Sequence, residues 1–128
     1  MGAIFNRGGI IPESYGLSLT VYPKTDVKAG QPVVFDATQG NYGVSLATDA
    51  KIDGIVKVGG KAGDPVSIYV IGKSRNVKIE TSAIVVAGDT VISNANGVFE
   101  KETVSEGSKA NGLLVLKGNS DKTAEVLI

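Results

Sequence analysis

The sequence predicts an all-β protein, and three observations support this prediction. Valine, isoleucine and threonine, which suit the pleated strand, are plentiful. Apolar and polar residues alternate in short runs such as LSLTV (17–21) and VSIYV (66–70), so that every second side chain faces the same side. The 17 glycines recur at intervals too short to leave room for many helices. We therefore expect a small β-barrel or β-sandwich.

Ten stretches have the length and composition of strands. Some alternate clearly, and the others are short apolar runs bounded by residues that favour turns, a pattern typical of buried strands. In order they are LSLTV (17–21), VVF (33–35), GVSLA (43–47), IDGIVKV (52–58), VSIYV (66–70), NVKIE (76–80), TVIS (90–93), VFEKE (98–102), GLLVL (112–116) and AEVLI (124–128). In the last stretch Ala124, Val126 and Ile128 share one face, which favours a strand that completes a sheet.

The segments between these stretches consist of residues that accept positive φ or bond their own backbone. They include TQGN (38–41), VGGKAGD (58–64), GKSRN (72–76), NANG (94–97) and KGNSDK (117–122). Asn96 and Gly97, between two apolar runs, favour a type I′ hairpin turn. The stretch ETVSEGSKANG (102–112) is predicted to be a loop with at most one turn of helix, because Gly107 lies in its middle.

One phrase occurs three times, as AGQPVV (29–34), AGDPVS (62–67) and AGDTVI (87–92). Each copy has a glycine that tolerates positive φ, followed within a few residues by the valine of an apolar strand. In two copies an aspartate, Asp64 or Asp89, comes directly after the glycine and suits the acceptance of backbone N–H bonds. We interpret the phrase as a turn that leads into a strand.

Residues 1–16 differ from the rest and are predicted to form an extended N-terminal arm before a β domain of residues 17–128. The segment MGAIFNRGGIIPESYG has glycine pairs and no sustained alternation, yet it carries apolar anchors. Two interpretations stay open: the anchors dock on a partner, or they cover one end of the barrel. The candidate capsid or subunit interface residues are Ile4, Phe5, Ile10, Ile11, Pro12 and Tyr15.

The composition argues against several classes of function. The 13 lysines and arginines balance the 13 aspartates and glutamates, so no field of one sign attracts nucleic acid. Cysteine and histidine are both absent, which removes thiolate nucleophiles, the commonest general base and the commonest metal ligands. We expect no enzyme activity, no catalytic, cofactor-binding or metal-binding residues, and no cofactor.

The apolar runs also bear on location. The start MGAIFNRGG lacks the charged and apolar regions of a signal peptide. No run approaches the ~20 apolar residues of a membrane span. The expectation is a soluble protein that is made in a cytoplasm and does not bind membranes.

Familiar ligand-binding motifs fail in detail. In DGIVKVGGKAG (53–63) Ile55 occupies the position of the first P-loop glycine, and Ala62 replaces the hydroxyl that would bind magnesium. The glycine spacing of a dinucleotide fingerprint is also wrong. DAKIDG (49–54) resembles the start of a calcium loop, but Lys51 occupies a ligand position and Gly60 stands where the closing glutamate belongs.

Two other functions stay open as alternatives. A hydrolase would need two converging carboxylates, whose separation the sequence does not reveal. Its candidates are Asp36, Asp49, Asp53, Glu80 and Glu100, each also explained as a residue of an outer face. A biotinyl or lipoyl carrier domain has similar glycine turns, but the lysine turns of this chain lack the methionine or acidic context of the modified lysine. Another small β binding module is also compatible.

The layout of the later strands resembles the small head decoration, or capsid cement, proteins of tailed bacteriophages. The resemblance rests on VAGDTVISNANGVFEKE (86–102), VSEGSKANGLLVL (104–116) and TAEVLI (123–128), in that order. AGQPVVF (29–35) and YGVSLATDA (42–50) resemble the opening of that family. The similarity extends over most of residues 17–128 and includes no catalytic signature.

The resemblance implies a β-tulip-like domain that binds the outer surface of an assembled phage head and stabilises it. It further implies that the partners are the major capsid protein and other copies of the chain, most simply as a homotrimer at three-fold or quasi-three-fold points. The location would then be the virion, with the protein made in the host cytoplasm. The arm would reach neighbouring capsid subunits.

Overall fold

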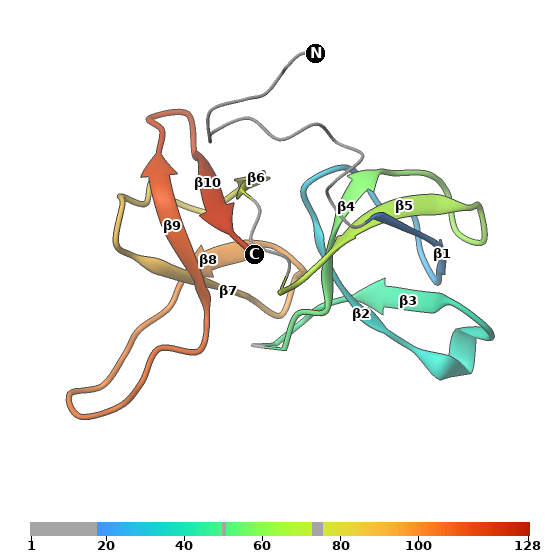
Figure 1. Ribbon diagram of the computed structural model, residues 1–128, viewed down its shortest axis with the longest axis horizontal. Helices are drawn as coiled ribbons and strands as arrows, with labels where there is room; N and C mark the ends of the chain where they lie inside the picture. The colour runs from blue at the N-terminus through green and yellow to red at the C-terminus, as the bar shows by residue number, and fades with distance from the viewer. Residues whose placement is uncertain (1–17, 50, 73–75) are drawn as a thin grey trace, which may run out of the picture.

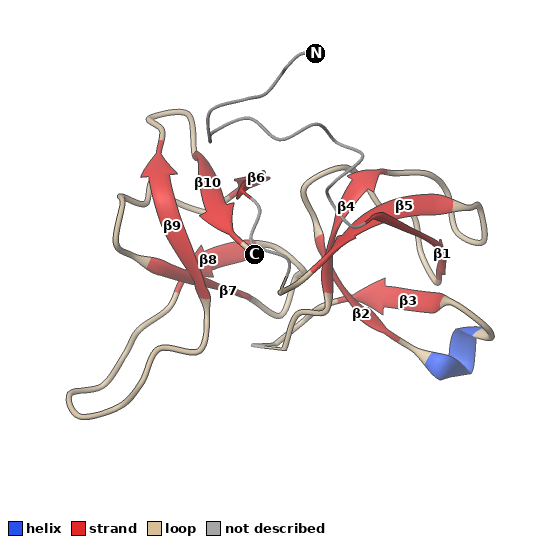
Figure 2. Cartoon of the chain, in the orientation of Figure 1, coloured by secondary structure: helices blue, strands red, loops and turns tan. Residues whose placement is uncertain are grey.

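The structure, a computed structural model, describes residues 18–49, 51–72 and 76–128. These residues form ten strands and one three-residue 3₁₀ helix, η2 (Ala37–Gln39), so the all-β prediction is confirmed (Figure 2). The strands are β1 (Ser18–Pro23), β2 (Pro32–Phe35), β3 (Gly43–Leu46), β4 (Gly54–Val58), β5 (Val66–Val70), β6 (Asn76–Glu80), β7 (Thr90–Ser93), β8 (Phe99–Lys101), β9 (Leu113–Gly118) and β10 (Thr123–Leu127). Each of the ten predicted stretches overlaps one of them.

The first five strands form a closed barrel in the order β1-β3-β2-β4-β5, with β5 pairing back to β1 (Figure 1). All pairs are antiparallel except β1 with β3. Alternation places every second side chain inside the barrel. The enclosed core consists of Val21, Val27, Val33, Val44, Val56, Val66 and Ile68, with Leu19 and Leu46 packed against it.

The last five strands form a second sheet beside the barrel, in the order β6-β10-β9-β7-β8 (Figure 1). Its two edges meet in a parallel bridge between Thr81, just after β6, and Phe99 of β8. The sheet therefore curves around a core of its own. Strand β10 lies between β6 and β9, so the last strand is central to this sheet.

The two halves have the same topology. If β1 to β5 are matched in turn with β6 to β10, the neighbours of each strand agree, and the Thr81–Phe99 bridge takes the place of the parallel β1–β3 pair. The registers agree as well, because Pro32 faces Ile55 where Thr90 faces Leu114. Even the irregularity agrees: the β4–β5 ladder skips Lys57, and the β9–β10 ladder skips Leu116. The chain therefore contains an internal structural repeat.

The repeat extends to the core. Eight positions that face inward in the barrel have inward-facing equivalents in the second half. The pairs are Leu19 and Val77, Val21 and Ile79, Val27 and Val85, Val33 and Val91, Val44 and Phe99, Val56 and Val115, Val66 and Ala124, and Ile68 and Val126. Aliphatic residues fill nearly all of these positions, so each half buries its own apolar interior.

The phrase that occurs three times is a type II turn each time. Gly30, Gly63 and Gly88 have φ values of 89°, 81° and 96°, and the alanine before each is not among the residues with positive φ. The residue after the glycine donates its backbone N–H to the carbonyl three residues earlier and accepts that residue's N–H with its side chain. For Asp89 the two distances to Val86 are 3.1 and 3.0 Å. Asp64 makes the same pair of bonds with Lys61, so the predicted role of both aspartates is confirmed.

The glycine of each turn also ties the turn to a neighbouring strand. The N–H of Gly30 donates to the Val56 carbonyl at 2.8 Å, and that of Gly88 donates to the Val115 carbonyl at 3.0 Å. Gly63 donates to Pro23 at 2.8 Å. The glycine N–H and the N–H and side chain of the residue after it are thus bonded within the fold, and the phrase is a strand-entry turn.

The hairpin turn between β7 and β8 differs from the prediction. Type I′ requires positive φ at Asn96, but only Gly97 has it, at 74°. Asn94 pairs with Val98 instead, and the Gly97 N–H donates to the Asn94 carbonyl at 3.0 Å. The Asn94 side-chain oxygen accepts the N–H groups of Asn96 and Val98, which favours a three-residue loop with a glycine bulge over the two-residue turn.

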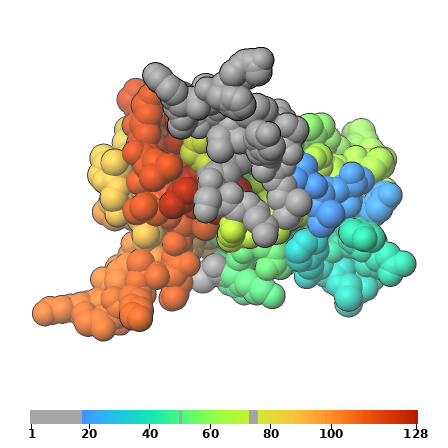
Figure 3. Space-filling view, in the orientation of Figure 1, coloured from blue at the N-terminus to red at the C-terminus, as the bar shows by residue number. Residues whose placement is uncertain are grey.

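The stretch from 102 to 112 is a loop, as predicted, and it projects from the second half of the molecule (Figure 3). Gly107, with φ of 82°, lies in it, and Ser108 donates its backbone N–H to the Ser105 carbonyl at 3.0 Å. The predicted arm, residues 1–16, lies outside the described residues.

Candidate interaction surfaces

The six residues predicted to form an interface lie outside the described residues, so their contacts stay a prediction. They are Ile4, Phe5, Ile10, Ile11, Pro12 and Tyr15. The described chain enters the barrel at Ser18, the first residue of β1, whose partner in β5 is Tyr69. The ammonium group of Lys57 donates to the Ser18 hydroxyl at 3.5 Å and lies 5.5 Å from the centre of the Tyr69 ring.

A groove of about 440 Å³ runs between the barrel and the second half, next to this entry point. Its walls come from the turn after β1, from β4 and β5, and from β6 and β10. The polar side chains along it belong to Lys57, Tyr69, Asn76, Lys78, Glu80 and Thr123. A groove with both charges and open sides suits contact with a polypeptide better than enclosure of a small molecule.

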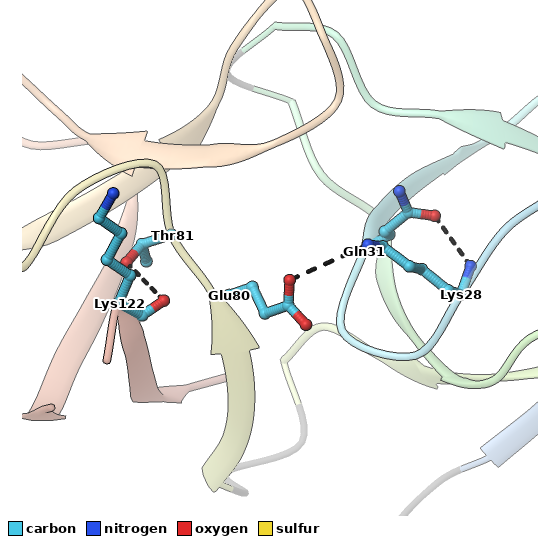
Figure 4. Close-up of polar contacts among 5 residues, drawn as sticks. All are labelled: Lys28, Gln31, Glu80, Thr81 and Lys122. Carbon is cyan, nitrogen blue, oxygen red and sulfur yellow. Dashed lines mark hydrogen bonds and ion pairs between the residues drawn. The ribbon is translucent and has the colours of Figure 1, made fainter. Parts of the chain in front are cut away.

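One polar contact across the boundary between the halves lies at the surface. The ammonium of Lys28 lies 4.0 Å from the Glu80 carboxylate, and both side chains are largely exposed, so this ion pair adds little stability (Figure 4). The backbone N–H of Lys28 donates to the Gln31 side chain at 2.9 Å, which fixes the turn. On the other side of β6, Thr81 donates its hydroxyl to the Lys122 carbonyl at 3.2 Å.

Apolar packing holds the halves together. Ile55 points out of the barrel, yet it is fully buried because the second half covers it. Gly97 lies against the Leu46 side chain, where an added Cβ would be 3.3 Å from Leu46 Cδ1. The Ser93 hydroxyl donates to the Ala47 carbonyl, which satisfies a buried polar group at the boundary.

The carboxylates considered for hydrolysis have separate structural roles. Asp36 accepts the Thr38 N–H at 3.0 Å at the start of η2, and bonds from Thr38 lower the pKa of this carboxyl group. Asp49 accepts the Lys51 N–H at 2.9 Å, and Asp53 accepts the Phe35 N–H at 2.9 Å. Glu80 forms the ion pair with Lys28, and Glu100 lies on β8.

Within residues 18–49, 51–72 and 76–128 no three acidic side chains group together in a way that could hold a metal ion. The same described part of the chain contains no helix with the length and apolar character needed to cross a membrane.

Two exposed apolar surfaces were not predicted. The first, named here the aliphatic strip, lies on and beside β9 and β10 of the second half. It consists of Ile84, Val86, Leu114, Leu116 and Leu127. The second, named here the aromatic cluster, surrounds Gly43 at one edge of the barrel and consists of Tyr22, Phe35 and Tyr42. Apolar patches of this kind on a small protein commonly mark contact sites.

The signal for the strip is present in the sequence but ambiguous. In the run LLVL (113–116) Val115 is buried in the core, while Leu114 and Leu116 on either side are exposed. A run that is apolar throughout indicates a strand covered on both faces. Here the outer face is open in the described structure, so the run marks a candidate contact surface.

No curated protein matches the chain. Among solved structures, the N base of head fiber gp8.5 of bacteriophage phi29 is similar, with a TM-score of 0.66. The alignment covers 88% of this chain and 92% of that chain at 15% identity, so it supports the shared fold and nothing more specific.

The match to a family is more informative. Residues 11–128 match the sequence model of the phage cement proteins, which includes both halves of the repeat and the end of the predicted arm. This match agrees with the resemblance found in the sequence and indicates a structural, non-enzymatic role in a bacteriophage. The chain belongs to the phage cement protein family.

Proposed function

We propose that this protein binds the outer surface of an assembled phage head and stabilises the shell against the pressure of the packaged DNA. It adds contacts that span neighbouring subunits of the major capsid protein and catalyses no reaction. The copies sit at three-fold or quasi-three-fold points as homotrimers. The arm of residues 1–16 reaches adjacent subunits through Ile4, Phe5, Ile10, Ile11, Pro12 and Tyr15.

The observation that carries this proposal is the family match over residues 11–128. The composition supports the proposal, because 13 positive and 13 negative side chains give the protein no net charge that would attract nucleic acid. The protein therefore stays unbound until the assembled shell is present. Many copies act on one shell, so a moderate affinity at each site is sufficient. The carrier and hydrolase alternatives have no comparable support.

Undecorated heads of the phage that encodes the protein provide the test. Purified protein is added, bound protein is measured by co-sedimentation, and the temperature at which the heads release DNA is recorded. We expect saturable binding and a higher release temperature. Absence of co-sedimentation would overturn the proposed binding, and binding with an unchanged release temperature would overturn the stabilising role.

The arrangement of the bound copies is a separate readout. Electron cryomicroscopy of decorated heads should reveal density in groups of three around three-fold or quasi-three-fold points of the outer shell. Isolated single copies or pairs across two-fold axes would contradict the trimer while leaving the binding itself intact.

A further inference from the structure

The internal repeat allows the two halves to be compared face by face. The barrel face around Ile55 of β4 and Tyr69 of β5 is covered by the second half, and Ile55 is completely buried. By the registers, the equivalent residues of the second half are Leu114 and Leu127. Both are exposed. The face that is covered on the barrel is therefore exposed on the second half.

The rest of the aliphatic strip follows the same rule. The bulge residue of β9, Leu116, is equivalent to Lys57, and Val86 is equivalent to Lys28 at the first position of the type II turn. On the barrel the covered face thus carries lysines near its rim, whereas the open face of the second half carries aliphatic side chains. Val86 is 61% exposed. The equivalent position of the barrel holds a lysine, so the fold does not require an aliphatic side chain there. An exposed aliphatic residue at such a position indicates contact with a partner.

The opposite surface shows the complementary relation. The second half covers the barrel with the end of β6, around Glu80, with Ser93 at the end of β7 and with Gly97 in the turn that follows β7. The equivalent region of the barrel holds Tyr22 and Phe35. Tyr22 follows Val21 as Glu80 follows Ile79, and Phe35 is the last residue of β2 as Ser93 is the last residue of β7.

Tyr42, which precedes β3, completes this region. These three residues are the exposed aromatic cluster. The surface with which the second half covers the barrel therefore has an aromatic, uncovered counterpart on the barrel.

We propose that copies of this chain associate head to tail, with the aromatic cluster of one copy covering the aliphatic strip of the next. The contact repeats between molecules the packing that joins the two halves within one molecule. Such a contact joins two different surfaces, so it generates a ring when the rotation between copies closes. The proposal deepens the self-association proposed above and rests on it only for the number of copies.

The exposed loop supports this direction of assembly. The segment 47–53 of the barrel leads from β3 to β4 and meets the second half at Ala47, whose carbonyl accepts the Ser93 hydroxyl. Its equivalent is the loop 102–112, because Ala47 donates its N–H to Pro32 as Glu102 does to Thr90. This loop projects from the molecule (Figure 3). In the proposed assembly this loop would contact the next copy, as the segment 47–53 contacts the second half within one molecule.

One pair of residues makes the proposal specific. Within the molecule Lys28 lies beside Glu80, 4.0 Å apart (Figure 4). The equivalent pair between molecules is Val86 of one copy and Tyr22 of the next. The internal pair is charged and the external pair is apolar, which suits a contact that has to form without a covalent link between its partners.

Disulfide trapping tests this pair, because the chain has no cysteine of its own. Val86→Cys and Tyr22→Cys are made as separate proteins, mixed in equal amounts and oxidised without capsids. We expect V86C–Y22C heterodimers well above the roughly two-to-one ratio over each homodimer that random pairing produces. The matched control mixes Tyr22→Cys with Val58→Cys, an exposed residue outside both surfaces that should stay near the random ratio.

Random pairing of V86C with Y22C would overturn the proposal, and so would an excess of V86C homodimers, which would indicate a two-fold contact.

A second experiment introduces charged residues into the proposed contact. Val86→Glu and Tyr22→Glu should each abolish trapping at a second site, Gly88→Cys with Thr20→Cys, whereas the combination of V86K with Y22E should restore it. If the copies still form the trapped disulfide but do not bind capsids, the proposed function is refuted and the head-to-tail contact is not.

Discussion

The carboxylate of Glu102 accepts a hydrogen bond from the backbone N–H of Asn111, with 2.9 Å between Oε2 and N, across the base of the loop that joins β8 to β9. The same carboxylate accepts the Gly112 N–H and the Thr90 hydroxyl, at 2.9 and 2.8 Å. Bonds to the charged form favour it, so the backbone groups of Asn111 and Gly112, followed by Thr90, lower the pKa of Glu102. One side chain thus holds both ends of the loop.

The first prediction concerns the pH dependence of this loop. Because the pKa is lower in the folded protein, the carboxylate stabilises the loop fully above the pKa of the unfolded chain. The stabilisation is lost as the pH falls through the folded value. Amide hydrogen exchange, corrected for intrinsic rates, should therefore show Asn111 and Gly112 losing protection in acid. Glu102→Gln should lose it at neutral pH, and Glu106→Gln in the same loop should not.

The second prediction concerns the closure of the second sheet. Phe99 is 1% exposed and its backbone forms the bridge to Thr81. Phe99→Ala removes the largest side chain of that core and should cost about 3–5 kcal/mol in the free energy of unfolding. Phe35→Ala is the matched control, because Phe35 is 46% exposed, and it should cost less than about 1 kcal/mol. Urea denaturation measures both, and equal losses would contradict the assigned core.

The third prediction uses the repeat. A Cβ at Gly118 would overlap the Val85 carbonyl, and a Cβ at the equivalent Gly59 would overlap the Val27 carbonyl. Gly118→Ala should therefore force the backbone apart and cost upwards of about 3 kcal/mol. Gly107→Ala meets open space and only the strain of positive φ, so about 1 kcal/mol is expected. Similar costs for the two variants, measured by thermal unfolding, would argue against this packing.

The ten strands were predictable because alternation and turn residues are local properties. Val66 and Ile68 face the barrel core, as their spacing indicates. The type I′ turn at Asn96 was wrong because the side chain of Asn94 reaches two N–H groups and favours a longer loop. That competition depends on geometry that a dipeptide does not encode.

The internal repeat was not predicted, although the recurring phrase belongs to it. Gly30 and Gly88 are equivalent, but the copy at Gly63 has no counterpart, since the turn from β9 to β10 is NSDK (119–122). The core positions hold interchangeable aliphatic residues, and the loops between strands differ in length. The equivalence of the two halves is therefore visible in the strand registers and not in the amino-acid sequence.

The fourth prediction concerns the arm, whose interface residues stay untested. Deletion of residues 2–12 removes Ile4, Phe5, Ile10 and Ile11. Each side chain contributes up to ~1.5–3 kcal/mol if it is buried on the capsid, and together they exceed the cost of ordering part of a glycine-rich segment. Both cores, as far as the structure describes them, consist of residues from 19 to 128. The melting temperature should therefore change by only a few degrees.

The affinity of the truncated protein for undecorated heads should fall at least about tenfold, a loss of about 1.4 kcal/mol. The full-length variant with Ile10→Ser and Ile11→Ser should show a smaller loss in the same direction, because the chain length is kept and only apolar contact is removed. Co-sedimentation measures the affinity and calorimetry the melting temperature. A truncated protein that melts far lower, yet binds heads as tightly once folded, would show that the arm belongs to the core, and the capsid contact would then have to lie on the described strands.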